Sequence, residues 1–122
     1  MPRKVLICED NAANRVLFRD ILAVDGIETI EATDGEAGVR LATAAAPDLV
    51  IMDIQMPVMN GYEAMRALRR SPPTSGIKII AVTSFAMSGD REKAIEAGAD
   101  EYLSKPVDTR QLRKLVRQML GL

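Results

Sequence analysis

Two adjacent acids, a third carboxylate, a hydroxyl and an amine follow separate apolar runs of this sequence. Brought together in space, such groups could hold a hard cation and bind a phosphoryl group. The residues are Glu9, Asp10, Asp53, Thr83 and Lys105. Each of these residue types is common in turns and helix caps, so any one of them alone is more often structural. Their occurrence in this order, after different runs, is a much rarer combination and indicates a functional site.

Crowding three carboxylates together is electrostatically costly. At ~4 Å and an effective dielectric constant near 20, each pair of charges costs about 4 kcal/mol. Protons or a bound cation must offset that repulsion. The chain has no histidine, which excludes His-ligated metals and Ser-His-Asp catalysis. Oxygen ligands alone suit Mg²⁺. An amine such as Lys105 could neutralise a phosphoryl group, and the Thr83 hydroxyl could hydrogen-bond one of its oxygens.

The stretch Leu49–Asp53 predicts the strand around which the other elements are organised. Apolar residues run without interruption from Leu49 to Met52, and Pro47 and Asp48 precede them. Such a short run, rich in Val and Ile, is typical of a strand buried on both faces of a parallel sheet. In open α/β sheets, ligands bind at the carboxyl ends of the strands, where Asp53 would lie.

Four further strands are predicted from similar runs. They are Lys4–Cys8, Ile27–Ala32, Ile77–Val82 and Tyr102–Leu103. Helices are predicted to follow the five strands, because caps or turn residues introduce helical patterns. The introducing residues are Asn11, Asp34, Asn60, Ser88–Asp90 and Asp108, and the first four helices end at about Val24, Ala45, Ser71 and Ala97.

The first and last of these helices are predicted to pack through apolar faces. In the first helix the predicted face is Ala13, Leu17, Ile21 and Val24, widened by Phe18 and Leu22. In the last it is Leu112, Leu115, Val116, Met119 and Leu120. The last set falls at i, i+3, i+4, i+7 and i+8, which is the strongest helical signal in the chain.

Alternation of strands and helices predicts an α/β fold. Five strands, each followed by a helix, favour a doubly wound parallel sheet with right-handed crossovers and helices on both faces. The carboxyl ends of parallel strands share one edge of the sheet. If the strand order is 2-1-3-4-5, the first and third strands are neighbours at the switch point, where a ligand crevice opens.

Length and charge restrict the possible functions. The 122 residues, with a net charge of -1, fit one domain over 1–122, and the lack of a basic stripe argues against nucleic-acid partners. Every apolar run is far shorter than the ~18 residues of a membrane span. The single cysteine, Cys8, and the lack of a signal peptide favour a cytoplasmic location.

With these residues in this order, the chain resembles the receiver domain of two-component response regulators over essentially its whole length. The matching motifs are Glu9-Asp10, Met52–Pro57 with Gly61, Thr83, and Lys105-Pro106. The stretch 83–90 is most similar to single-domain DivK-type regulators and to receivers of hybrid histidine kinases. The resemblance implies a flavodoxin-like (βα)5 fold with strand order 2-1-3-4-5.

The same resemblance implies specific roles for the site residues. Asp53 would accept a phosphoryl group through its carboxylate. Together with Glu9, Asp10 and the main-chain carbonyl of Gln55, it would hold Mg²⁺, or Mn²⁺ in its place.

Further roles concern the response to the phosphoryl group. Lys105 would pair with it and Thr83 would follow it inward, with Tyr102 as a switch aromatic whose rotamer is coupled to Thr83. The Lys105-Pro106 bond would be cis.

Three positions affect how long the phosphoryl group would survive. Ser84 stands where the family usually has alanine, which would alter access to the group. Gln55 and Phe85 occupy positions that tune dephosphorylation in the family. Since an apolar Phe85 cannot position an attacking water, we predict a long-lived phosphoryl group, and hydrolysis within seconds would contradict this.

The predicted function is therefore a phosphorylation switch, a signalling domain more than an enzyme. A histidine kinase or histidine phosphotransferase would donate to Asp53. No DNA-binding or catalytic domain follows Leu122, so output is expected through a downstream protein at the face of the fourth helix, fifth strand and fifth helix, unless the chain is part of a longer protein.

Three alternatives predict different chemistry. A Mg²⁺-dependent phosphatase with Asp53 as nucleophile would need a second aspartate where Gln55 stands. A flavin- or nucleotide-binding protein would need a glycine-rich phosphate loop after the first strand. A phosphorylation-independent scaffold would not need the site residues at all.

Overall fold

A computed structural model describes residues 3–84 and 89–122. Its five strands are β1 Lys4–Cys8, β2 Glu28–Ala32, β3 Leu49–Asp53, β4 Lys78–Thr83 and β5 Glu101–Ser104. Its five helices are α1 Ala12–Ala23, α2 Gly35–Ala45, α3 Gly61–Arg70, α4 Asp90–Ala97 and α5 Thr109–Leu120. The predicted elements are therefore present, with boundaries that shift by one or two residues. Phe85 lies outside the described residues.

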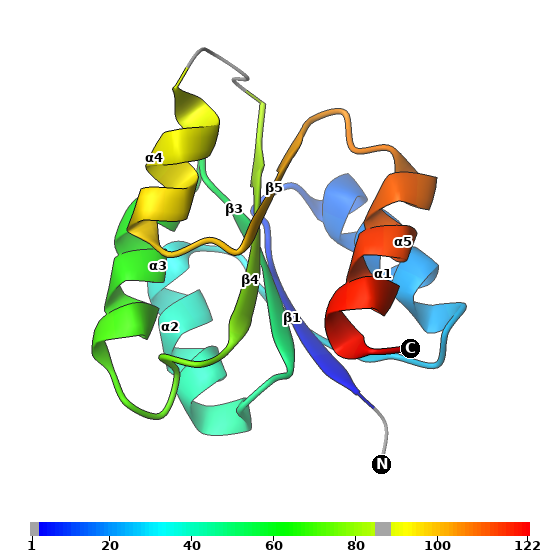
Figure 1. Ribbon diagram of the computed structural model, residues 1–122, viewed down its shortest axis with the longest axis horizontal. Coiled ribbons are helices and arrows are strands. Elements are labelled where there is room, and N and C mark those ends of the chain that lie inside the picture. Colours follow the sequence, from blue (N-terminus) through cyan, green and yellow to red (C-terminus); the bar gives the residue numbers. More distant parts are fainter. Residues whose placement is uncertain (1–2, 85–88) are drawn as a thin grey trace.

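The strands form one parallel sheet in the order β2-β1-β3-β4-β5, which confirms the predicted α/β fold. Figure 1 shows α2, α3 and α4 on one face of the sheet and α1 and α5 on the other. The strand order places β1 beside β3, with Cys8 opposite Met52. The acidic residues that follow Cys8 therefore lie next to the end of β3.

Four of the helices, α1, α2, α3 and α5, begin where their caps predict. Asn11, Asp34 and Asn60 each accept a hydrogen bond from the backbone N–H three residues later. Asn60 and Glu63 form a reciprocal capping box, which satisfies two N–H groups that have no partner within the helix. Asp108 accepts from the N–H groups of the second and third residues of α5.

Two apolar layers cover the sheet, and every residue of β3 is buried. Cys8 lies in the layer beneath α2 and is fully buried. Burial, followed by the charge of Asp34, raises the pKa of its thiol to about 12. In the layer beneath α1 and α5, α5 contributes the residues predicted for it: Leu112, Val116 and Leu120 are buried.

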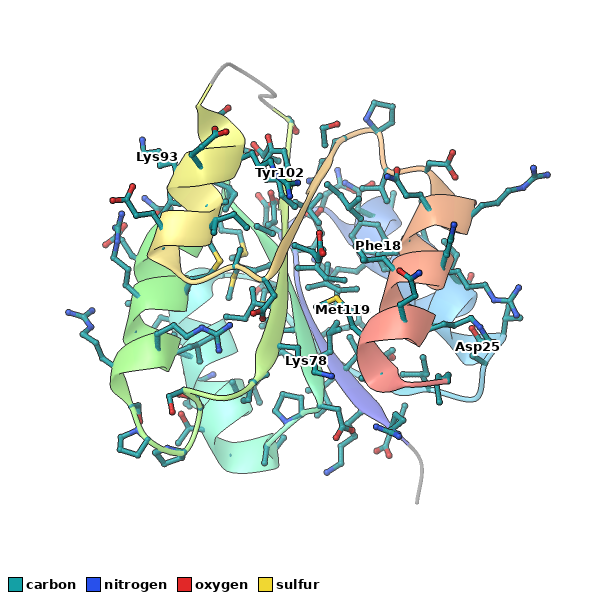
Figure 2. All side chains as sticks on the ribbon, viewed as in Figure 1. Phe18, Asp25, Lys78, Lys93, Tyr102 and Met119 are labelled. Atoms are coloured by element: carbon teal, nitrogen blue, oxygen red, sulfur yellow. The ribbon has the colours of Figure 1, made fainter. Side chains whose placement is uncertain are left out.

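The predicted apolar face of α1 is correct at Phe18 and Leu22 and wrong at Leu17 and Val24. Phe18 and Leu22 are the buried residues of this helix, whereas Leu17 and Val24 are 41% and 67% exposed. Apolar side chains surround much of α1, so periodicity alone does not select a face. Packing against the sheet and α5 selects the stripe that carries the large Phe18 ring (Figure 2).

Arg69 ties together three segments at the amino edge of the sheet. Its guanidinium donates to the carbonyls of Ser75, Ile77 and Gly98 and pairs with Asp100 at 3.0 Å. A Cβ on Gly98, whose φ is +126°, would lie 2.7 Å from Arg69 Cγ. We call these contacts the Arg69 cluster. It joins the end of α3, the turn before β4 and the end of α4.

A second ion cluster joins the turn after α1 to α5. Arg113 contacts both carboxylate oxygens of Asp25 at 2.9 Å, and Arg117 contacts one of them at 2.7 Å. Figure 2 labels Asp25 beside α5, and Lys78, which donates to the carbonyl of Met119 near the end of that helix.

Among the described residues, no helix has the length and apolar character that crossing a bilayer demands.

Candidate functional site

The predicted acidic residues meet at the carboxyl edge of the sheet. One carboxylate oxygen from each of Glu9, Asp10 and Asp53 lies within 4.8 Å of the other two. Glu9 and Asp53 are 0% and 2% exposed, whereas Asp10 faces solvent. The structure therefore assembles the three carboxylates predicted from separate strand ends into one partly open cluster.

Lys105 reaches the same cluster from the segment after β5. Its Nζ lies 2.6 Å from Glu9 Oε1 and 3.3 Å from Asp53 Oδ2, and its side chain is 16% exposed. Lys105 therefore contacts the two buried carboxylates of the cluster, Glu9 and Asp53. The Lys105-Pro106 bond is cis, as predicted.

The two buried carboxyls differ in their readiness to ionise. Burial, then a hydrogen bond and charge repulsion from Glu9, raises the pKa of Asp53 to about 7. Burial also opposes ionisation of Glu9, but hydrogen bonds to Asp53 and Lys105 outweigh it and lower its pKa. The pKa of Lys105 is raised, because these carboxylates outweigh the effect of its own burial. Around neutral pH, Asp53 is therefore protonated in part, and a bound cation would favour its ionised form.

The donor set fits Mg²⁺. It offers carboxylate oxygens only, it is crowded enough to need a cation, and its exposed Asp10 leaves one side open for water. These are the ligand type and partial hydration that Mg²⁺ requires. The backbone N–H of Gln55 donates to Asp53 Oδ1 at 3.2 Å. The Gln55 main-chain carbonyl remains a predicted further ligand.

The side chain of Gln55 has a contact that the sequence did not predict. Its Nε2 donates to Thr83 Oγ1 at 2.7 Å, and its Oε1 accepts from the Ser84 N–H at 3.1 Å. Thr83 itself is 2% exposed. The amide therefore links the segment after β3 to the end of β4, directly beside the acidic cluster.

Tyr102 lies farther along the same side of the sheet. It packs against the layer beneath α3 and α4, and Figure 2 labels it between β5 and α4. Its hydroxyl is buried and finds no hydrogen-bond partner within residues 3–84 and 89–122. Lys93 lies 5.1 Å from the ring centroid of nearby Tyr62. A buried hydroxyl without a partner costs free energy, so this ring position is not strongly held by polar contacts.

The loop between β3 and α3 folds tightly over Asp53. The N–H of Gly61 donates to the Ile54 carbonyl at 3.0 Å, and a Cβ at Gly61 would collide with the Asp53 carbonyl. Only glycine fits this position without moving Asp53. The match of Gly61 to the predicted motif thus has a steric reason.

An open groove lies beside Lys105. Its volume is about 400 Å³, and its lining combines residues of α1 with the segment after β5, including Leu17, Phe18, Pro106 and Val107. Leu17 and its neighbour Val16 are 41% and 43% exposed. This surface is not predicted from the sequence, because the apolar periodicity of α1 places Leu17 in the core. Recognising a second apolar stripe on α1 could have revealed it.

Comparisons with known proteins agree with this geometry. A family model described as the response regulator receiver domain matches residues 5–117. The polar-differentiation response regulator DivK of Brucella anthropi is 40% identical over 121 residues, which cover 99% of this chain and 98% of that protein. DivK of Brucella ovis is 39% identical with the same coverage.

Solved structures share the fold. The receiver domain of a sensor histidine kinase from Pseudomonas aeruginosa, with a magnesium ion coordinated in its active-site cleft, is 32% identical, with a TM-score of 0.91 and full coverage of both chains. The receiver domain of a Saccharomyces cerevisiae response regulator, co-crystallised with its histidine phosphotransfer protein, is 29% identical with a TM-score of 0.89. That match covers 97% of this chain and 88% of the other.

Proposed function

This chain belongs to the response regulator receiver domain family, and from that premise we propose that Asp53 is its phosphoacceptor. It is a receiver domain of two-component or phosphorelay signalling, similar to DivK. We take residues 1–122 as one receiver domain. The observation that carries the assignment of Asp53 is its place at the end of the central strand, within 4.8 Å of two further carboxylates.

The proposed reaction is transfer from a phosphohistidine to a carboxylate. One oxygen of Asp53 attacks phosphorus, and the P–N bond to the donor histidine breaks. The electron pair leaves on the imidazole nitrogen, which takes up a proton from solvent. Lys105, now 3.3 Å from Asp53, would then pair with the phosphoryl oxygens. Only the ionised form of Asp53 can attack, so a protonated Asp53 must first lose its proton.

Glu9, Asp10 and Asp53 would hold the Mg²⁺ that this transfer requires, with the Gln55 carbonyl as a further ligand. Bound there, the ion would offset the charge of the carboxylates and of the phosphoryl oxygens. Mn²⁺ could take the same oxygen ligands. Support comes from the carboxylate cluster itself and from the magnesium in the related kinase receiver.

Switching would follow from rearrangement of the contacts beside Asp53. Thr83 would leave the Gln55 amide, 2.7 Å away at present, and donate to a phosphoryl oxygen. Tyr102, whose buried hydroxyl is not held by the described residues, would change rotamer with it. This is a population shift, so a partner responds only if it binds the two states differently.

The phosphoryl donor would dock on the groove beside Lys105. A histidine kinase or histidine phosphotransferase presents its histidine on a protein surface, and the groove combines apolar Leu17 and Val107 with direct access to Lys105. The yeast receiver in complex with its phosphotransfer protein shows that such domains form such pairs. The exposed side chains of Val16 and Leu17 would be covered in the complex.

Output would pass through α4, β5 and α5. A hollow of about 310 Å³ on this face is lined by Arg91, Tyr102, Lys114 and their neighbours, so a change at Tyr102 would alter a surface that a downstream protein could bind. The cytoplasmic location and the long phosphoryl lifetime stay predictions, the latter because Phe85 lies outside the described residues.

The test is intact mass after incubation with acetyl phosphate, with and without Mg²⁺. We expect a gain of about 80 Da, one phosphoryl group, that needs Mg²⁺ and is absent from Asp53→Asn. If acetyl phosphate gives no adduct, a phosphorylated histidine kinase is the second donor. Failure of both donors with the wild-type protein would contradict phosphoacceptor function and favour a scaffold.

A further inference from the structure

Arg15 occupies an unfavourable place for a cation. It is the fourth residue of α1, whose first turn contains no acidic side chain. The amino end of a helix carries partial positive charge, so a guanidinium here is disfavoured by the helix itself. Contacts outside the helix must therefore explain its fixed position.

Two of those contacts reach the Glu9–Asp10 backbone and a third reaches β2. Arg15 Nη1 donates to the carbonyl of Glu9 at 2.9 Å and to that of Asp10 at 3.0 Å. Its Nε lies 3.3 Å from Glu31 Oε1 on β2, and the side chain is only 19% exposed. The guanidinium thus fastens the backbone after β1 to both α1 and β2.

The two acids of the pair depend on this backbone to different degrees. The Glu9 carboxylate is held by the Asn11 N–H, the Asn14 amide and Lys105. The exposed Asp10 carboxylate has no hydrogen bond or ion pair in the part of the chain that the structure describes. Its position toward the other two carboxylates is consequently set by its main chain, and Arg15 holds that main chain through the carbonyl.

We infer that Arg15, oriented by Glu31, is a positioning residue that holds the Glu9–Asp10 backbone where the Asp10 carboxylate can ligate Mg²⁺. The inference rests on the proposed metal-dependent function. Arg15 does not touch the metal or the phosphoryl group in this role. Outer partners of this kind typically change metal affinity by 10–100-fold when they are removed.

Charge alone predicts the opposite effect. Arg15 is a cation beside a cluster of carboxylates, so removing it should strengthen binding of another cation if Arg15 acts only through its charge. If Arg15 acts by positioning, removal frees the Asp10 backbone and weakens binding. The direction of the change in Mg²⁺ affinity therefore distinguishes the two explanations.

The experiment measures the Mg²⁺ dissociation constant by isothermal titration calorimetry for the wild type, Arg15→Gln and Glu31→Gln. The matched control is Arg19→Gln, which removes the same charge from the same helix. Arg19 is 47% exposed and, within residues 3–84 and 89–122, pairs only with its neighbour Asp20, at 3.5 Å. We expect about tenfold weaker binding for Arg15→Gln, about threefold for Glu31→Gln and less than twofold change for Arg19→Gln.

Amide hydrogen exchange of the metal-free proteins gives an independent readout. Exchange at the Asn11 amide, which donates to Glu9 Oε2, should accelerate in Arg15→Gln and stay unchanged in Arg19→Gln. If Arg15→Gln fails to fold, Arg15→Lys replaces it: an ammonium keeps the charge but cannot span both carbonyls and Glu31, so severalfold weaker Mg²⁺ binding is still expected.

Unchanged or tighter Mg²⁺ binding in the folded Arg15 variant would overturn the positioning role. Failure of the proposed function looks different, because the wild-type protein itself would then bind no Mg²⁺ or accept no phosphoryl group from either donor. If the wild-type protein binds Mg²⁺ and the Arg15 variant binds it equally well, only the positioning role of Arg15 is refuted.

Discussion

The two edges of the sheet treat charge in opposite ways. At the amino edge, the Arg69 cluster gives one guanidinium three carbonyls and a carboxylate, so the cation is fully matched. At the carboxyl edge, three carboxylates lie together and Lys105 pairs with two of them, Glu9 and Asp53. Burial, then the neighbouring Glu9, raises the pKa of Asp53 to about 7. The first edge stabilises the fold, while the second retains a deficit that a metal ion can fill.

The largest difference between the two edges is expected when one aspartate at each edge is replaced by asparagine. Asp53→Asn is expected to abolish phosphorylation, with at least a hundredfold loss in the rate of mass gain, because the attacking oxygen is gone. Asp25→Asn removes the carboxylate shared by Arg113 and Arg117 and is expected to lower thermal stability while phosphorylation persists. Phosphorylated Asp53→Asn would contradict the comparison.

Arg69→Ala should cost more stability than any single change at the carboxyl edge. Several backbone carbonyls and Asp100 would lose their donor, so we expect about 2–4 kcal/mol of destabilisation in urea unfolding. Phosphorylation of the folded fraction should be unaffected. The control is Arg70→Ala, since Arg70 is exposed and, among the residues that the structure describes, donates only to the carbonyl of Arg66 in its own helix. It should change stability by less than about 0.5 kcal/mol.

Raising the pH should lower the stability of the metal-free protein, because Asp53 loses its proton. The folded state holds this proton up to about pH 7, whereas an unfolded aspartate releases it near pH 4. Between these values the folded state binds more protons, so stability falls as pH rises, by about 1 kcal/mol or more. Thermal melts from pH 4.5 to 7.5 should show this decline, and Asp53→Asn should flatten it. Saturating Mg²⁺ should restore stability at the upper end.

The smallest effect is expected for Gln55→Ala. Losing the two hydrogen bonds to Thr83 and Ser84 should cost about 1 kcal/mol of stability. Because Thr83 would no longer be held by the amide, NMR shifts of the β4 end should also move toward those of the phosphorylated protein. Gln55→Glu retains the acceptor for Ser84 and should show a smaller shift. Unaltered β4 resonances in Gln55→Ala would mean that the amide does not restrain Thr83.

The strands and their chemistry could be predicted because both are local. An unbroken apolar run ending in Asp53 specifies a buried strand and what lies at its end, and Asn60 with Glu63 specifies where the next helix begins. Parallel topology then brings distant strand ends to one edge. The predicted site residues depend on nothing beyond that rule and the family resemblance.

What the sequence could not reveal depends on contacts between distant segments. Arg15 and Gln55 have flexible side chains whose partners lie on other elements. No spacing pattern in the sequence therefore indicates these contacts. The prediction of which face of α1 is buried is partly wrong for a related reason. With apolar residues on several sides, only the packing of the Phe18 ring decides that Leu17 points outward.

Cys8 has a practical consequence for following the switch in real time. Its thiol is fully buried, and its pKa of about 12 leaves almost no thiolate at neutral pH, so maleimide reagents should ignore it in the folded protein. A new cysteine at an exposed position of α4, such as Glu92, could then be labelled selectively with the natural residue left in place. Fluorescent or spin probes would thereby become available without disturbing the core beneath the acidic pair.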